Sequence, residues 1–268
     1  MPIPYDPANP DFEAVRRIFF DWLRANPRGA QLSRTGDTYL PYVEFAGSRD
    51  PQVLAFHIVE VFWQLLLEGI VAPGMNSSNM DLPWFHLTSY GHAVLQQESG
   101  HPHDPAGYLE RVRSRVPAPD DTVMAYLSES LTAFRRGTIV AAAVMLGVAA
   151  ERVFLLVCDG ILGALGDPRE KATFERLVER FAMKPKLDWV HEKLQVVQNR
   201  RLAGFPENAT LMVTAVYDLL RSQRNDLGHP REVPPKLDRQ ELFANLQVFP
   251  RFYETAEQLR TFLSGTQI

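Results

Sequence analysis

Three polar residues near the end of a predicted helix, Arg224, Asn225 and His229, are of types that bind an anion and move a proton. The guanidinium of an arginine is always charged and presents a planar fork of donors. An imidazole has an ordinary pKa near ~6.5, so it serves as an acid or a base near neutral pH. On a continuous helix Arg224 and His229 would lie ~140° apart. Gly228 can end the helix, and Pro230 pushes His229 out of the α region, so the three side chains can converge at one helix terminus.

Arg221 lies one turn before Arg224 on the same predicted helix and is a candidate for a further phosphate contact. The buried face of this helix is expected to consist of Leu211, Val216, Leu219 and Leu220. An alternative interpretation needs no site at all. An arginine close to a helix C-terminus complements the helix dipole, and Asn225 with Asp226 forms a turn.

Turn residues divide the second part of the chain into six predicted helices, which indicates an all-α bundle. The second helix is apolar nearly all round and should be central, because its Ala and Gly residues allow close approach by neighbours. Glu151 interrupts it, and a carboxylate there must find a partner or face a cleft. Alternatively, Glu151 and Arg152 mark a solvated stripe. The helices are expected near residues 121–136, 138–163, 168–183, 187–201, 207–225 and 238–264.

The first part of the chain mixes helices with short strands. An amphipathic helix is predicted over 11–23 with Asp11 as its N-cap, and a strong helix is predicted over 51–69. Two strands then flank a polar tip at 75–81. The strands are expected at 38–44, 70–72 and 84–88.

Proline, glycine and aspartate are concentrated over residues 98–120, which is typical of a linker. His101, His103 and Asp104 form the densest group of potential zinc ligands there. The surrounding Pro and Gly residues favour a solvated loop instead, so we expect no metal. The predicted division is 1–97, 98–120 and 121–268.

The composition excludes several classes of protein. The chain has 268 residues, 46% of them apolar, so each part can bury its own core. Its single cysteine, Cys158, lies in an apolar stretch, where a small buried side chain is expected. The first residues lack the basic and apolar segments of an export signal, and no apolar run reaches the ~18 residues of a membrane span. We therefore expect a cytoplasmic protein that does not bind membranes.

The charges are unevenly distributed. The chain has 28 basic and 32 acidic residues, but no Lys or Arg occurs between Asp50 and Glu110, where seven acids lie. The stretch from residue 119 onward is balanced, with 19 basic and 19 acidic residues. Phosphate contacts by Lys and Arg supply most non-specific affinity for nucleic acid, so the first part is poorly suited to bind duplex DNA.

Residues Arg224, Asn225 and His229 resemble the R-x4-6-H motif of the HEPN superfamily, in which a polar residue follows the arginine. The similarity covers about residues 121–264, and the Ala-rich helix that carries Glu151 also suits HEPN domains. The resemblance implies a metal-independent endoribonuclease of the toxin or phage-defence kind, without a cofactor.

The resemblance to HEPN domains implies a role for each candidate residue. Arg224 would grip the scissile phosphate, His229 would act as acid or base, and Asn225 would orient the substrate or His229. Arg221 and Glu151 are tentative substrate contacts. The resemblance also implies a homodimer, because HEPN domains pair so that both motifs face one cleft.

Residues 11–97 resemble a bacterial winged helix, with the polar tip at 75–81 as the wing. The expected fold class is therefore mostly α, with a winged-helix-like α+β domain followed by a HEPN-like helical bundle. Because cations are missing from the recognition-helix and wing region, we expect this domain to contact a protein, such as an antitoxin or regulator, or to support dimerisation.

Two other functions remain open on the sequence. The HEPN-like bundle could be a non-catalytic platform for dimerisation or nucleotide sensing. A winged-helix transcription factor is the third hypothesis, and the cation-free stretch disfavours it.

Overall fold

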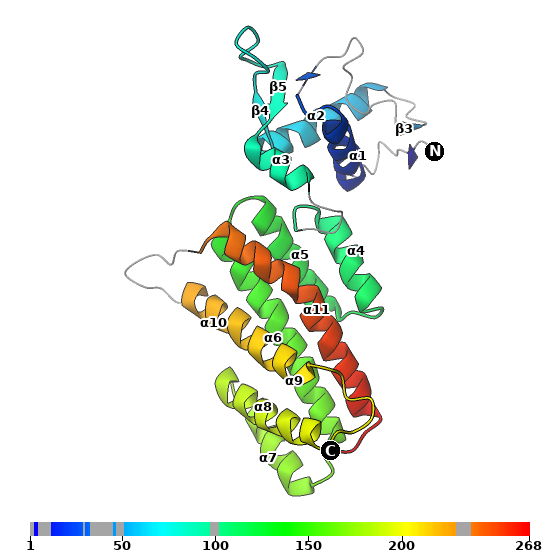
Figure 1. The fold of residues 1–268 in the computed structure, drawn as a ribbon, viewed down its shortest axis with the longest axis vertical. Coiled ribbons are helices and arrows are strands. Elements are labelled where there is room, and N and C mark those ends of the chain that lie inside the picture. The colour runs from blue at the N-terminus through cyan, green and yellow to red at the C-terminus, as the bar shows by residue number, and fades with distance from the viewer. Residues whose placement is uncertain are drawn as a thin grey trace. The chain divides into compact units, whose positions relative to one another are not determined.

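The computed structural model divides the chain into two compact units, Met1–Ser99 and Gly100–Ile268. The chain is built mainly of helices (Figure 1), which confirms the prediction of a mostly α protein. The residues that the structure describes are 3–4, 12–28, 30–32, 45–46, 51–96, 102–228 and 237–268.

The first unit combines helices with short strands. The helices of its described residues are α1 (Phe12–Ala25), α2 (Pro51–Leu67) and α3 (Ser89–Leu95). The strands β2 (Ala30–Gln31), β5 (Trp84–Leu87) and β4 (Val71–Pro73) form an antiparallel sheet in that order. The strands β1 (Ile3–Pro4) and β3 (Phe45–Ala46) pair in parallel.

The core of the first unit is aromatic. Phe19 of α1, Phe62 of α2 and Phe85 of β5 are fully buried against one another. Arg16 and Glu68 form a buried ion pair between α1 and the end of α2. Apolar residues at helical spacing on α1 and α2 thus bring the two helices together over the sheet.

The predicted elements of the first unit are confirmed where the structure describes them. The strong helix and the two later strands begin and end within two residues of their predicted bounds. Gly69, with a φ of +72°, turns the chain from α2 toward β4. The predicted N-cap Asp11 and the strand at 38–44 lie outside the described residues.

The second unit is helical throughout its described residues. Its α-helices are α4 (Pro105–Arg115), α5 (Asp121–Arg135), α6 (Ile139–Ala164), α7 (Pro168–Val178), α8 (Met183–Asn199), α9 (Ala209–Leu211), α10 (Tyr217–Gly228) and α11 (Arg239–Ser264). A π-helical turn, Met212–Val216, joins α9 to α10. The six predicted helices are all present, but two bounds differ. α7 ends at Val178 rather than at 183, and α8 begins at Met183 rather than at 187, because Pro185 fits its first turn.

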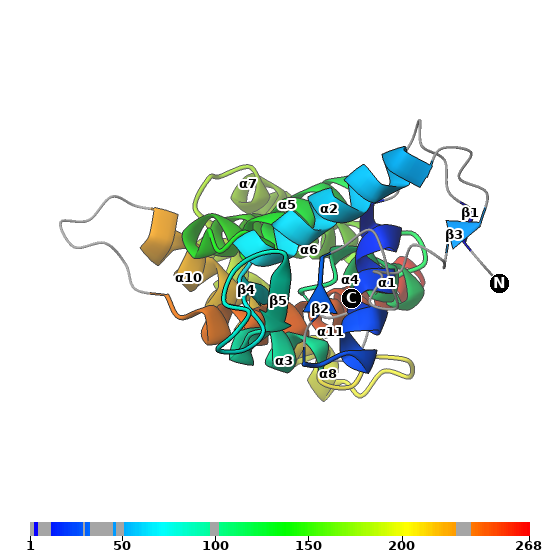
Figure 2. The ribbon, with the colours of Figure 1, turned by 90° about the horizontal axis from the view of Figure 1, so that it is seen from above.

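The central helix is α6, as predicted. It packs against α5, α10 and α11, and Figures 1 and 2 show it running through the middle of the unit. The hydroxyl of Ser130 on α5 donates to the carbonyl of Ala142 at 2.7 Å. Within the described part of the chain, α6 alone has the length and hydropathy of a membrane span, and half of its most apolar stretch is buried inside the bundle. Glu151, Arg152 and Asp159 interrupt its apolar run, so no uninterrupted apolar stretch of this helix reaches ~18 residues.

The buried face predicted for the helix over 207–225 is partly wrong. Leu220 is buried, but Leu211 and Leu219 are 62% and 53% exposed. The π-helical turn adds a residue to one turn and thereby rotates the following helix relative to a regular continuation. The residues that face the core instead are Val213, Thr214, Tyr217 and Leu220.

Of the predicted linker 98–120, the structure describes residues 102–120, and these are not a loose linker. Asp104 caps the N-terminus of α4, and Pro105 occupies the first helical position, so the same residues that suggested a loop start a helix. Tyr108 of α4 is fully buried and its hydroxyl donates to the carbonyl of Leu246 at 2.5 Å. This helix belongs to the second unit.

The prediction of a solvated histidine cluster is wrong for His103. Its ring is 6% exposed and lies between Phe134 and Phe243. His101 lies outside the described residues. In the parts of the chain that the structure describes, no three His, Cys, Asp or Glu side chains gather to hold a metal ion.

Candidate functional site

The candidate site is built where α10 crosses α6 at close range. A Cβ atom added to Gly147 of α6 would lie 2.4 Å from the Cβ of Arg224 and 3.2 Å from the carbonyl oxygen of Leu220. Only a glycine permits this approach, since real Cβ contacts below 3.0 Å essentially do not occur. The close packing places the stem of Arg224 directly on the central helix.

Arg224 is held by two predicted site residues. Its guanidinium donates to the carboxylate of Glu151 on α6 and, over 2.9 Å, to the side-chain oxygen of Asn225. The side chains of Arg224 and Glu151 are 30% and 24% exposed, so the pair lies half-buried at the surface of the bundle. The prediction that Glu151 must find a partner is confirmed.

Arg152, the neighbour of Glu151, faces another way. Its guanidinium donates to both carboxylate oxygens of Asp120, at distances between 2.8 and 3.3 Å. This guanidinium lowers the pKa of Asp120 below its ordinary value, against the opposing effect of burial. A shared solvated stripe for Glu151 and Arg152 is therefore wrong, because each side chain has its own partner on another element.

Tyr217 lies on the face of α10 that also carries Arg221 and Arg224, at spacings of four and seven residues. Its ring stacks on Phe154 of α6 with 4.2 Å between centroids and 3° between planes. The ring is fully buried, and the hydroxyl has no hydrogen-bond partner among the residues that the structure describes. Burial raises the pKa of Tyr217; the charge of Glu151 raises it further, and those of Arg221 and Arg224 oppose this.

Arg221 is engaged on its own helix. Its guanidinium donates to the carboxylate of Asp218 at 2.7 and 3.1 Å, and the side chain is 17% exposed. The ammonium of Lys184 lies 4.0 Å from the same carboxylate. Arg221 therefore lies one helical turn from Arg224 but binds Asp218, and not Glu151 or Asn225, in the structure.

A chain of amides fixes the end of α10 against α11. The side chain of Asn245, 7% exposed, donates to Gln223 at 2.7 Å, and Gln223 donates to Glu241 at 2.8 Å. Gln223 directly precedes Arg224. The helix end that carries the motif is thus tied to two neighbours, α6 through Glu151 and α11 through Asn245.

The structure joins some predicted site residues and leaves one untested. Arg224, Asn225 and Glu151 form one hydrogen-bonded group, which together with Tyr217 we call the Arg224 cluster. α10 extends to Gly228, three residues beyond the predicted end at 225 and at the glycine that can end the helix. His229 lies outside the described residues, so its approach to Arg224 stays a prediction.

Tyr217 and the Gln223–Asn245 hydrogen bond were not predicted from the sequence. Seven-residue spacing between Tyr217 and Arg224 could have placed both on one face. Nothing in the sequence indicates that the Tyr217 hydroxyl lacks a partner, because this depends on packing against α6. Cys158, predicted to be buried, is fully buried, and desolvation raises the pKa of its thiol to about 12.

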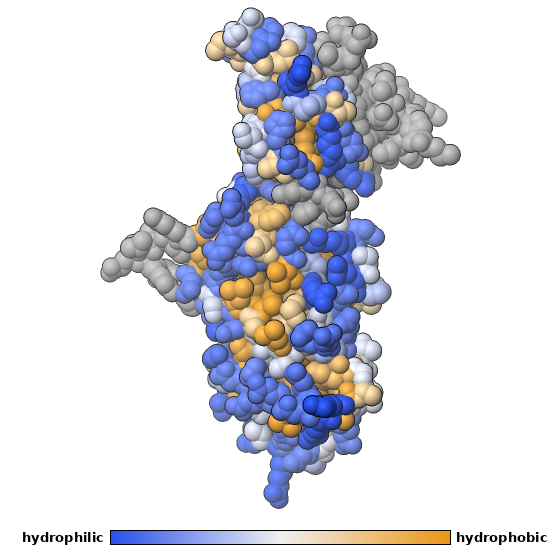
Figure 3. All heavy atoms as spheres, viewed as in Figure 1, coloured by the Kyte–Doolittle hydropathy of each residue, from blue (hydrophilic) through white to orange (hydrophobic). Residues whose placement is uncertain are grey.

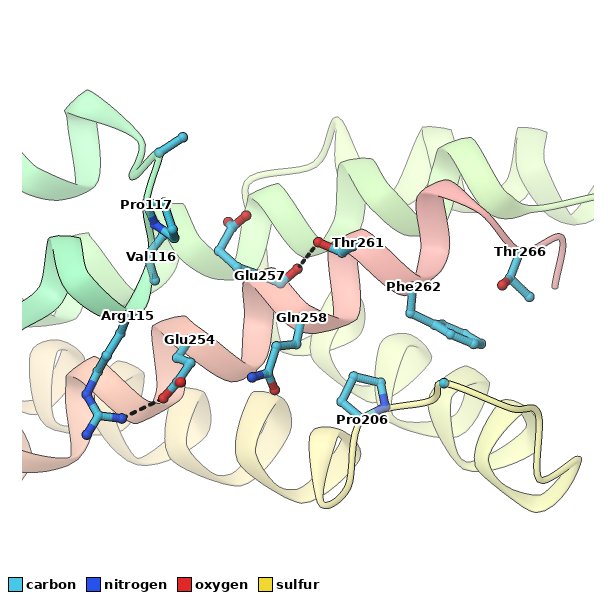
Figure 4. Close-up of a pocket in the computed structure, with 12 residues that line it drawn as sticks. Arg115, Val116, Pro117, Pro206, Glu254, Glu257, Gln258, Thr261, Phe262 and Thr266 are labelled. Atoms are coloured by element: carbon cyan, nitrogen blue, oxygen red, sulfur yellow. Dashed lines mark hydrogen bonds and ion pairs between the residues drawn. The ribbon is translucent and has the colours of Figure 1, made fainter.

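A separate groove of about 710 Å³ lies along the C-terminal half of α11. Glu254, Glu257 and Phe262 line it from α11, and Pro117 and Pro206 line it from two loops (Figure 4). Both carboxylates are already paired, Glu254 with Arg115 and Glu257 with Arg260, each at 2.6 Å. The groove contains none of the predicted site residues.

Comparison with protein-family models, with curated proteins and with solved structures finds no match to this chain.

Proposed function

We propose that the chain is a metal-independent endoribonuclease of the HEPN toxin or phage-defence type. The observation that carries the proposal is the half-buried Arg224, which Glu151 and Asn225 hold at the end of α10, a few residues before His229. A half-buried guanidinium at a helix end, close in the chain to a histidine, is suited to bind a phosphate once it leaves the carboxylate of Glu151.

The contacts of Arg224 argue against simple helix termination. An arginine that only complements a helix end contacts the last carbonyl groups or lies in solvent. The hydrogen bonds of the Arg224 side chain instead go to a carboxylate on another helix and to the side chain of Asn225. These two bonds fix the direction of the guanidinium. A binding site requires a fixed direction, whereas the electrostatic stabilisation of a helix end does not.

The proposed reaction uses side chains alone. The 2′-oxygen of RNA attacks the adjacent phosphorus, the bond to the 5′-oxygen breaks, and a 2′,3′-cyclic phosphate and a 5′-hydroxyl result. His229 would take the proton from the 2′-hydroxyl, or deliver one to the leaving oxygen. Arg224 would stabilise the negative charge of the phosphorane, and Asn225 would orient the substrate or His229. Glu151 would hold Arg224 until the substrate arrives rather than contact the substrate.

One Arg and one His are few groups for this reaction, so we propose a homodimer with two copies of the motif in one cleft. Apolar surface on the second unit supports pairing. On α6, Val144, Val148 and Leu155 are partly exposed on the stripe that carries Glu151. Figure 3 shows further apolar side chains gathered over α10 and α11, where Leu219 and Val248 are exposed.

The test is cleavage of tRNA and mRNA by the full chain and its variants. Arg224→Ala and His229→Ala should each lower cleavage at least ~100-fold, as the loss of one charge-stabilising group typically does. Arg260→Ala is the matched control, because Arg260 is also half-buried and ion-paired but lies on α11 beside Glu257. Cleavage that survives both site substitutions would place the chemistry elsewhere.

A non-catalytic role as a dimerisation or nucleotide-sensing platform is the second candidate. It is favoured by one observation: in the free chain Glu151 neutralises Arg224, so the guanidinium is not open to a substrate. Inert behaviour toward every RNA, together with a higher Tm in the presence of a nucleotide, would favour this role.

For the first unit we propose a winged-helix-like domain in the cytoplasm that contacts a protein. Its sheet order β2-β5-β4 and the sequence of α1, β2, α2, β4 and β5 support the winged-helix comparison. The helix α2 would be the recognition helix, yet it exposes Trp63 and Leu67 and carries no cation. Such a surface suits an antitoxin or regulatory protein better than DNA phosphates. Tight binding of the full chain to random duplex DNA in a mobility-shift assay, uncompeted by RNA, would contradict this.

A further inference from the structure

The Tyr217 hydroxyl stands out because it is buried without a hydrogen-bond partner. Tyr217 is 0% exposed, and its phenol oxygen forms no hydrogen bond with any of the described residues. Buried polar groups are nearly always paired, since an unpaired one loses its bonds to water without replacement. A phenylalanine would fill the same space without this penalty.

The surroundings of the hydroxyl indicate which partner it could take. The parallel stack on Phe154 fixes the ring between α10 and α6. Glu151 lies one turn before Phe154 on α6. After burial, the charge of Glu151 has the largest effect on the pKa of Tyr217, ahead of those of Arg221 and Arg224. Among Glu151, Arg221 and Arg224, only the carboxylate of Glu151 can accept a hydrogen bond. Arg224 binds one of its oxygens, so the second oxygen can accept a bond from the Tyr217 hydroxyl.

We propose that Tyr217 is a positioning residue that holds Glu151 when Arg224 turns away from it. In the free chain Glu151 binds Arg224. When Arg224 swings to a phosphate, the Tyr217 hydroxyl donates to the carboxylate that Arg224 has released. Arg224 and Tyr217 thus exchange places as donors to Glu151.

This exchange lowers the free energy needed to release Arg224. Without it, the half-buried Glu151 would lose the cation that pairs with it among the described residues and would draw Arg224 back. In the exchange, the Tyr217 hydroxyl gains a hydrogen bond that it lacked, and the Glu151 carboxylate replaces the bond that it lost. The presence of a phosphate substrate rests on the proposed function, whereas the pairing of Tyr217 with Glu151 is a property of the chain itself.

The first test therefore uses no RNA. In the otherwise unchanged full chain, Tyr217→Phe should leave the Tm unchanged or raise it, because it removes a hydroxyl that has no partner. In an Arg224→Met background, which releases Glu151 but keeps the stem that packs on Gly147, the same substitution should lower the Tm by about 2 to 4 °C. Arg224→Leu, which also lacks a donor, serves the same purpose if Arg224→Met does not fold.

Tyr108→Phe is the control for these measurements. Its hydroxyl already donates to the carbonyl of Leu246 in the free chain. The loss of Tm should therefore be equal in both backgrounds. If Tyr217→Phe also has the same effect with and without Arg224, the hydroxyl does not bind Glu151 and the exchange is wrong.

The second test measures binding of an uncleavable 2′-O-methyl RNA. Tyr217→Phe should weaken binding about tenfold, the expected loss of one hydrogen bond to a charged group, without a lower Tm. Equal binding by the variant and the unchanged chain would overturn the exchange. If the unchanged chain neither binds nor cleaves RNA, the proposed function is wrong. The Tm measurements then still decide whether Tyr217 pairs with Glu151.

Discussion

Gly147 and Arg224 are in contact across α6 and α10 at a distance that leaves no room for a side chain. An added Cβ on Gly147 would lie 2.4 Å from the Cβ of Arg224. The end of α10, with the proposed catalytic arginine, therefore owes its position to a glycine in the central helix.

Gly147→Ala should destabilise the chain even though alanine favours a helix. The gain of up to ~1 kcal/mol from helix propensity is outweighed by overpacking, which costs about 1 to 3 kcal/mol. Thermal unfolding measures the change. Gly163→Ala in the same helix is the control, because no atom lies within 4 Å of its added Cβ, and it should raise stability. A more stable Gly147→Ala variant would mean that α10 does not pack this closely.

Glu151→Gln should bind uncleavable RNA about tenfold more tightly than the unchanged chain. The substitution removes a carboxylate that competes with phosphate for Arg224 and repels the RNA backbone. Fluorescence anisotropy at fixed salt gives the Kd. The matched control is Glu257→Gln, since Glu257 is equally exposed, at 24%, and is also paired with an arginine. Weaker binding by Glu151→Gln would show that Glu151 supports the substrate instead of competing with it.

The Asp120–Arg152 pair should make stability depend on acid pH. Hydrogen bonds from Arg152 lower the pKa of Asp120 in the folded chain, so this carboxylate stabilises the fold above its unfolded pKa, near ~3.9. The contribution is lost as the pH falls through the lower folded pKa. Asp120→Asn keeps an N-cap for α5 but removes the charge. The Tm of this variant should lie below that of the unchanged chain at pH 7. The two Tm values should converge as the pH drops below about 4. A difference that is constant with pH would contradict a charge effect.

The thiol of Cys158 should not react with Ellman's reagent in the folded chain. It is fully buried in α6, and desolvation raises its pKa to about 12, so almost no thiolate forms at pH 8. One equivalent should react once guanidinium unfolds the second unit. Rapid labelling of the folded chain at pH 8 would show that the core around Cys158 opens readily.

The sequence by itself determined the helices and their order. The apolar periodicity of α6 and α11, and the Gly and Pro residues between helices, are local properties, and the predicted bounds of these two helices agree with the structure to within one residue. Gly228, which by its residue type can end a helix, is the last residue of α10, three residues beyond the predicted end at 225.

Only the tertiary structure decided which partner each polar side chain takes. Periodicity places Glu151 on a face of α6, but the choice of Arg224 as its partner depends on the helix that packs there and on the close contact at Gly147. The π-helical turn before Tyr217 rotates the face of α10, so Tyr217 faces the core and Leu219 does not. The prolines before α4 suggested a linker, yet burial of Tyr108 and His103 on the bundle makes the segment a helix of the second unit. In each case the deciding free energy comes from contacts between residues far apart in the chain, which local sequence patterns do not record.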